Sequence, residues 1–220
     1  MPAGARIYLG LVFFVALGSV VPAAAGKIGP DAVWQPDPAV LATVRAQCHQ
    51  FGGKELGQCF AAAMSKAGAS PAAVAFAHLF DGIAYLEKLE KADGPVVLAH
   101  VFFPYRANEN SAWFLVNGEP ELMDVDDHRY IALDQLQQAP SYRALHRRFP
   151  DVMLWPGMRG PVGPAPTMRP GGGQRFVIAY VLRNLCHACA IIGRVDYAFD
   201  FDESGRFVGT KLLSVEKASG

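Results

Sequence analysis

Two cysteines near the end of the chain stand at a spacing that supports thiol chemistry. Cys186-His187-Ala188-Cys189 is a Cys-x-x-Cys motif, and such motifs serve as redox-active dithiols, as half of a zinc site, or as local disulfides. The thiolate is the reactive form, and an imidazole such as His187 can lower the pKa of a neighbouring thiol. The motif alone leaves all three chemistries open, so its surroundings must decide between them.

The sequence after the motif lacks the scaffold of a thioredoxin-like site. In such sites the motif begins a long helix, whose N-terminus stabilises the thiolate. Here only Ala190–Gly193 separate the motif from a predicted strand, which leaves room for about one helical turn. Thioredoxin-like folds also place a cis-proline beside the motif, and no proline follows Pro170. We therefore expect a structural disulfide between Cys186 and Cys189, and we keep a redox pair assisted by His187 as the alternative.

Metal and haem binding are less consistent with these residues. A closed zinc site needs a second pair of Cys or His ligands, and Cys48-His49 with Cys59 would supply it only by giving up a disulfide of their own. Covalent haem attachment needs a histidine directly after the second cysteine, where Ala190 stands. No Gly-x-Ser-x-Gly, His-Glu-x-x-His or phosphate-binding glycine loop occurs either. We predict no metal, no cofactor and no catalytic residue; a thiol-disulfide oxidoreductase is the one enzyme class kept open.

The N-terminus has the three parts of a cleavable signal peptide. Arg6 supplies the positive charge, Ile7–Val21 contains no charged residue, and Ala23–Ala25 offers small side chains for cleavage. The apolar run is shorter than the roughly 20 residues that span a bilayer. We predict a signal peptide over residues 1–25, a mature chain of residues 26–220 without a membrane span, and a periplasmic or secreted location.

The four cysteines are an even number, which suits an oxidising compartment. Proximity along the chain favours Cys48–Cys59 together with Cys186–Cys189, and a crossed pattern joining the two ends of the chain stays open. Cys48 is predicted near the end of one helix and Cys59 near the start of the next. A bridge between them would staple a helical hairpin, so we predict that all four cysteines form structural disulfides.

The composition excludes some classes of partner. The 20 basic and 20 acidic side chains balance and are dispersed, whereas nucleic-acid binding needs clustered cations. The hydrophobic fraction of 51% is too high for a disordered chain. About 195 residues remain after cleavage, enough for one domain with its own core. We expect a single domain whose partner, if it has one, is another protein outside the cytoplasm.

Apolar residues at helical spacing predict three N-terminal helices. The first two flank Gly52–Gly53 and form the hairpin. The third begins at a capping Ser70 followed by a first-turn proline, and we predict that it runs to about Glu90. Its first half is apolar on nearly all sides, so His78 is predicted to be a buried core or interface histidine.

Period-two alternation and turn residues predict strands in the remainder of the chain. Asn117-Gly118 is a strong hairpin signal between two of them. Asp126-Asp127 is expected to cap a helical stretch that follows, and a second short helix is expected over residues 141–149. The predicted strands are residues 96–103, 112–116, 121–125, 176–182, 194–201 and 207–215.

The last three strands form a predicted antiparallel meander, with the Cys-x-x-Cys motif in its first connection. Alternation of apolar and polar side chains predicts that Val195, Tyr197, Phe199 and Phe201 face the core. A disulfide in the connection would fix the register, because a slip of one residue would turn this face to water.

Two features beside the meander also yield expectations. Leu185, Ile191 and Ile192 flank the motif, so the connection is expected to tuck partly against the core, with His187 projecting outward as an ordinary turn residue. Residues 155–173 contain five prolines and six glycines, which predicts a mobile, exposed loop.

Two acidic clusters match cation sites only in part. Asp200–Gly205 resembles the opening of a calcium loop, but the position of the bidentate carboxylate is Lys211. Asp124–His128 offers carboxylates and an imidazole where a strand meets a helix. A hairpin turn and an N-cap explain these groups, so neither cluster is predicted to bind a metal.

Together these patterns predict an α+β protein. An N-terminal helical hairpin and a third helix would pack on an antiparallel sheet, and the chain would end in a three-stranded β-meander. We expect an exported, disulfide-stabilised binding or inhibitory module that is not a catalyst. The alternative is a periplasmic thiol-disulfide redox protein that uses Cys186 and Cys189.

Overall fold

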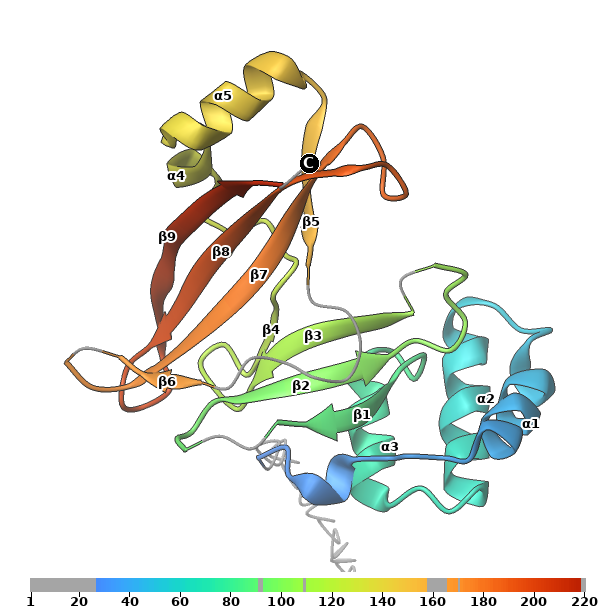
Figure 1. Ribbon diagram of the computed structural model, residues 1–220. Helices are drawn as coiled ribbons and strands as arrows, with labels where there is room; N and C mark the ends of the chain where they lie inside the picture. The colour runs from blue at the N-terminus through green and yellow to red at the C-terminus, as the bar shows by residue number, and fades with distance from the viewer. Residues whose placement is uncertain (1–26, 91–92, 109, 158–165, 170, 219–220) are drawn as a thin grey trace, which may run out of the picture.

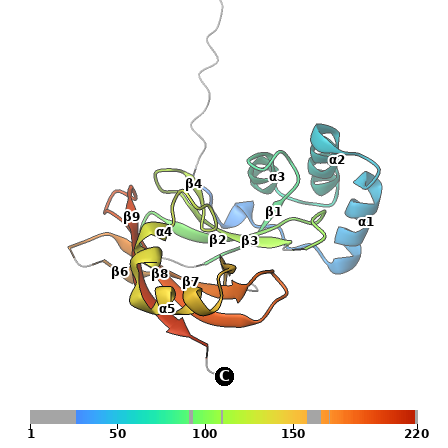
Figure 2. The same ribbon diagram turned by 90° about the horizontal axis from the view of Figure 1, so that it is seen from above.

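The computed structural model describes residues 27–90, 93–108, 110–157, 166–169 and 171–218. The predicted signal peptide lies outside the described residues. The described chain forms three layers, with helices on one face of a first antiparallel sheet and a second antiparallel sheet against its other face (Figures 1 and 2). This arrangement confirms the predicted α+β class, although it contains two sheets where the sequence indicated one with a terminal meander.

The N-terminal helices confirm the predicted hairpin. They are the 3-10 turn η1 (Pro30–Ala32), α1 (Pro38–Cys48), α2 (Gly53–Lys66) and α3 (Pro71–His78). Ser70 caps α3 as predicted, because its Oγ accepts a hydrogen bond of 2.9 Å from the amide of Ala73. The apolar faces of these helices pack around Trp34 and Phe60, against the edge of the first sheet.

The prediction that the third helix continues to Glu90 is wrong. The helix ends at His78, and β1 (Tyr85–Leu89) follows it. Gly82 lies in the left-handed region at φ 77° and passes so close to α2 that a Cβ there would stand 2.4 Å from the carbonyl oxygen of Gly57. This close approach turns the chain into the sheet and ends the helix. His78 is exposed in the last turn, so its predicted burial is also wrong.

The first sheet has the strand order β1-β2-β3-β4. Its further strands are β2 (Val97–Phe102), β3 (Ser111–Val116) and β4 (Leu122–Asp124). Asn117, at φ 68°, starts the turn between β3 and β4 and confirms the predicted hairpin. Alternate side chains separate the two faces: Val101 packs toward the helices, whereas Leu98 and Leu115 pack toward the second sheet.

The second sheet contains the predicted meander. Its order is β5-β7-β8-β9, with β6 also paired to β7. The strands are β5 (Val152–Pro156), β6 (Thr167–Met168), β7 (Gln174–Asn184), β8 (Ile191–Phe201) and β9 (Phe207–Lys217). The four alternating side chains of β8 are at most 1% exposed, as predicted: Val195, Tyr197, Phe199 and Phe201. Helices α4 (Leu133–Gln138) and α5 (Pro140–Arg148) lie beside β9 (Figure 1).

Two predictions before the meander need correction. Asp126 and Asp127 do not cap a helix, because α4 begins later, at Leu133, after a turn in which the Asp124 carboxylate accepts from the Asp126 amide. The predicted loop over 155–173 is partly strand, since its first residues complete β5 and two later ones form β6. Pairing with β7 supplies the hydrogen bonds that local sequence did not reveal. Residues 158–165 and 170 lie outside the described residues.

A buried amide joins the two sheets. Gln174, at the start of β7, is 2% exposed. Its Oε1 accepts from the Val96 amide at 2.8 Å, and its Nε2 donates to the Val96 carbonyl at 2.9 Å. The hydroxyl of Tyr180 also donates to the carbonyl of Val125. These bonds fix the register of one sheet over the other and satisfy polar groups inside the shared apolar core.

Candidate functional site

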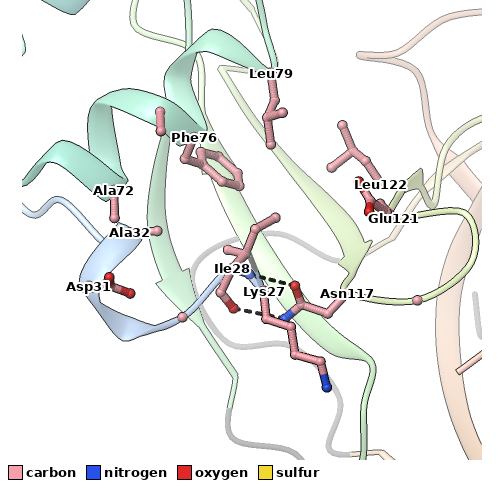
Figure 3. Close-up of a pocket in the computed structure, with 13 residues that line it drawn as sticks. Lys27, Ile28, Asp31, Ala32, Ala72, Phe76, Leu79, Asn117, Glu121 and Leu122 are labelled. Atoms are coloured by element: carbon pink, nitrogen blue, oxygen red, sulfur yellow. Dashed lines mark hydrogen bonds between the residues drawn. The ribbon is translucent and has the colours of Figure 1, made fainter. Parts of the chain in front are cut away.

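A cleft of about 480 Å³ lies between the N-terminal segment, α3 and the turn between β3 and β4 (Figure 3). Most of its wall is apolar. Phe76 and Leu79 line it from α3, Ile28 from the N-terminal segment, and Leu122 from β4. Leu79 is 47% exposed although it is a large apolar side chain. Concave sites of this size with mainly apolar walls are typical of small-molecule or peptide binding.

The Asn117 side chain holds one wall of this cleft in place. Its Oδ1 accepts from the Ile28 amide at 2.7 Å, and its Nδ2 donates to the Ile28 carbonyl at 2.8 Å (Figure 3). The pair of bonds attaches the N-terminal segment to the end of β3 as a neighbouring strand would. Ser70 adds a second attachment, because its hydroxyl donates to the carbonyl of Asp31. The cleft is therefore largely preformed.

The charged groups of the cleft stand at its rim. Lys27, Asp31 and Glu121 are exposed members of the lining. They surround an apolar interior in which Phe76 is 2% and Ala32 is 3% exposed. The polar side chains of the lining are Lys27, Asp31, Asn117 and Glu121. This arrangement can hold an apolar group inside and make polar contacts at the edge.

The Cys-x-x-Cys motif occupies the exposed turn between β7 and β8, at the far end of the second sheet from the cleft. Cys186 and Cys189 are bonded in the structure, with 5.0 Å between their Cα atoms. Cys186 is exposed and Cys189 is half-buried. Cys48 and Cys59 form the other bridge, between α1 and α2, with a Cα separation of 5.7 Å. The favoured pairing is thus the one present, and the crossed pattern is not.

The residues that flank the motif are more exposed than predicted. Leu185 is 61% and Ile191 is 38% exposed, and only Ile192, at 9%, reaches the core. His187 does not project freely, because its ring lies 5.0 Å from that of Trp155 in an edge-to-face arrangement. Leu185 and Ile191 therefore lie on the surface, next to a bulge in the β7–β8 pairing between Leu182 and Arg183.

An arginine contacts the backbone of the Cys-x-x-Cys turn. Arg183 is 8% exposed, and its Nη1 donates to the carbonyl oxygen of Cys189. Its Nε is buried and has no hydrogen-bond partner among the described residues. The indole nitrogen of Trp155 is also buried and has no hydrogen-bond partner among the described residues. A cation next to a cysteine favours the thiolate form, and here a buried positive charge is hydrogen-bonded to the backbone of Cys189.

The cluster at Asp200–Gly205 has the expected explanation, a hairpin turn, whereas the one at Asp124–His128 forms a turn and not the expected N-cap. The Asp202 carboxylate accepts from the hydroxyl of Ser204 and from the amides of Arg206 and Ser204 in the turn between β8 and β9, and these bonds lower its pKa. Asp200 pairs with Arg175 at 2.6 Å. Burial raises the pKa of Asp124. Among the described residues, no three His, Cys, Asp or Glu side chains gather as a metal site would require.

Sequence reasoning missed three residues of these two sites. Asn117 was read only as a turn former, and its contact with Ile28 spans 89 positions. Arg183 and Trp155 meet the motif through the pairing of β5 with β7, which the sequence did not predict. A signal was present for one of them, because an arginine inside an apolar strand requires a specific partner.

The described part of the chain contains no helix long and apolar enough to cross a membrane. Comparison of the sequence with models of protein families, with curated proteins and with solved structures finds no match. The geometry of the cleft and of the Cys-x-x-Cys turn is therefore the basis for any functional assignment.

Proposed function

We propose that this chain is an exported, disulfide-stabilised binding protein, periplasmic or secreted, whose ligand occupies the cleft between the N-terminal segment, α3 and the β3–β4 turn. The observation that carries the proposal is the cleft itself, with an apolar interior of about 480 Å³ and charges confined to the rim. An inhibitory role would use the same surface, if the group inserted is a side chain of another protein.

The ligand that best fits the cleft is an apolar group of modest size with a polar end. Phe76, Leu79 and Leu122 would contact the apolar part. Asp31 and Glu121 outnumber Lys27 at the rim, so a neutral or cationic polar end is favoured over an anionic one.

A filling substitution tests this proposal. Ala75 lines the cleft and is exposed, and Ala62 is an exposed alanine of α2 outside the lining. Ala75→Trp should weaken binding of an apolar probe such as a fluorescent naphthylamine by about tenfold or more, because the indole occupies the volume the probe needs. Ala62→Trp is the matched control and should leave binding unchanged. Equal binding by wild type and Ala75→Trp would exclude the cleft as the site.

A further inference from the structure

We propose that the Cys186–Cys189 turn is a thiol-disulfide exchange site that oxidises cysteine-containing polypeptides. This activity is separate from ligand binding in the cleft. The first observation is the buried guanidinium of Arg183, which touches the Cys189 carbonyl and leaves Nε without a partner among the described residues. Burial of a cation is unfavourable unless an anion or an acceptor compensates it.

Reduction of the bridge would supply that compensation. A closed disulfide is neutral and offers the guanidinium no negative charge. The thiolate of Cys189, which belongs to the residue that Arg183 already contacts, is an anion and a hydrogen-bond acceptor. The neighbouring cation therefore stabilises the reduced form relative to the oxidised one. A site whose reduced form is stabilised takes electrons from other thiols.

The second observation is an apolar surface around the bridge. Met153 and Ile191 lie opposite Arg183 on the two neighbouring strands. Met153 is 45%, Ile191 38% and Leu185 61% exposed. Leu185 also holds φ at 78°, a left-handed conformation unusual for such a side chain. Backbone strain at an exposed apolar residue is typical of functional sites, and this surface suits a polypeptide with apolar residues beside its cysteines.

The exchange proceeds in two steps. A thiolate of the substrate attacks Sγ of Cys186, the more exposed of the two residues; the Cys186–Cys189 bond breaks and Cys189, whose carbonyl Arg183 contacts, leaves as the thiolate. The second substrate thiolate then attacks the substrate sulfur of the mixed disulfide, forms the substrate disulfide and releases Cys186 as a thiolate, which takes a proton from water. Two electrons pass from the substrate dithiol to the motif.

An equilibrium with glutathione tests the role of Arg183. The mature chain is equilibrated in buffers of varied reduced and oxidised glutathione, and the fraction of reduced Cys186 and Cys189 is measured by alkylation and peptide mass. Arg183→Met should shift the midpoint toward the disulfide by about tenfold or more. Arg183→Lys keeps the charge and should retain most of the wild-type behaviour. Arg194→Met removes an exposed charge of β8 and should shift the midpoint less than about twofold.

Equal midpoints in wild type and Arg183→Met, or an equal shift in Arg194→Met, would overturn the proposal. A second measurement needs no variant at Arg183. In the reduced chain carrying Cys186→Ser, ultraviolet absorbance of the thiolate should place the pKa of Cys189 below the ordinary value of about 8.5. A pKa at or above that value would also overturn it.

The substrate class is tested with two synthetic dithiol peptides, one with leucines beside the cysteines and one with serines. The wild-type chain should oxidise the leucine peptide several times faster, because the surface of Met153, Leu185 and Ile191 favours apolar groups. Cys186→Ser with Cys189→Ser should oxidise neither. Equal rates for both peptides would reject the polypeptide surface, and no oxidation by the wild type would reject the exchange site.

Discussion

The two disulfides of this protein are the same kind of bond, but they lie in very different surroundings. Cys48 is 0% exposed and packs with Phe60 and Tyr85 in the core under α1 and α2. The Cys186–Cys189 bridge closes a surface turn with a separation of three positions, against eleven for the first bridge. One bridge therefore supports a core, and the other presents sulfur to the surface.

The difference shows that surroundings, more than the sequence motif, assign a role to a disulfide. The helical bridge has apolar neighbours, and opening it would place the thiol of Cys48 in a packed core and leave that of Cys59 half-buried at its edge. The turn that carries the other bridge contains a backbone contact to the buried guanidinium of Arg183 and an aromatic pair of His187 and Trp155. Four predictions test whether this contrast holds, and they are ordered by the size of the expected effect.

The largest expected effect is selective reduction. Under native conditions a mild thiol reductant should open Cys186–Cys189 on the order of 100-fold faster than Cys48–Cys59, because access to sulfur controls the exchange rate. Timed alkylation followed by peptide mapping measures both rates in one sample. Reduction of both bridges at the same rate would remove the contrast, since it would mean that burial of Cys48 gives no protection.

The second prediction concerns stability. Cys48→Ala with Cys59→Ala should lower the free energy of unfolding by about 3 kcal/mol, and Cys186→Ala with Cys189→Ala by about 2 kcal/mol, because the shorter loop restricts the unfolded chain less. Denaturant unfolding of both double variants and the wild type measures these changes. A larger loss at the turn than at the helices would show that the turn bridge is the main structural staple.

The sequence predicted both bridges, but it predicted the surroundings of the first well and those of the second poorly, for a physical reason. The helical hairpin follows from local periodicity and from Gly52–Gly53, so Cys48 and Cys59 were placed correctly. The surroundings of Cys186 depend on β5, whose pairing places Trp155 and an arginine at the motif. Such contacts join segments far apart in the chain, and no local pattern encodes them.

The same reason explains the other corrections. The meander and its buried aromatic face were predicted because alternation is a local signal, as for Tyr197 and Phe199. The end of α3 was missed because the contact of Gly57 with Gly82 ends it, and this contact is visible only in three dimensions. The cleft was missed for a similar reason, since Asn117 meets Ile28 across 89 positions.

The third prediction tests whether the backbone strain at Leu185 outweighs the packing of its side chain. Leu185→Gly should raise the free energy of unfolding by about 1 kcal/mol, because glycine adopts a positive φ without steric conflict and the leucine side chain is largely exposed. Oxidation of a leucine-flanked peptide should slow at the same time. Thermal unfolding and the peptide assay measure the two effects. Destabilisation would instead mean that Leu185 packs usefully against its neighbours.

The smallest expected effect concerns the next turn of the same meander, where the Asp202 carboxylate accepts from the Ser204 hydroxyl and from the amides of Arg206 and Ser204. Because these bonds lower the pKa of Asp202 in the folded chain, the stability they give is present at neutral pH. It is lost as pH falls below about 4, through the folded pKa. Asp202→Asn should therefore lower the free energy of unfolding at pH 7. The free energy should also fall less steeply in acid than in wild type, as measured by denaturant unfolding at each pH. A decline identical to that of wild type would assign the acid sensitivity to other carboxyl groups.

The paired hydrogen bonds between Gln174 and Val96 bear on the order in which the chain folds. Each sheet is built mostly from strands that follow one another in sequence, whereas this contact joins residues 78 positions apart. Contacts of long separation form late, because the intervening chain must first be ordered. A chain that is synthesised from its N-terminus would thus expose the apolar face of the first sheet, with Leu98 and Leu115, until the meander has been made and packs against it. That interval is when the protein would depend most on a chaperone.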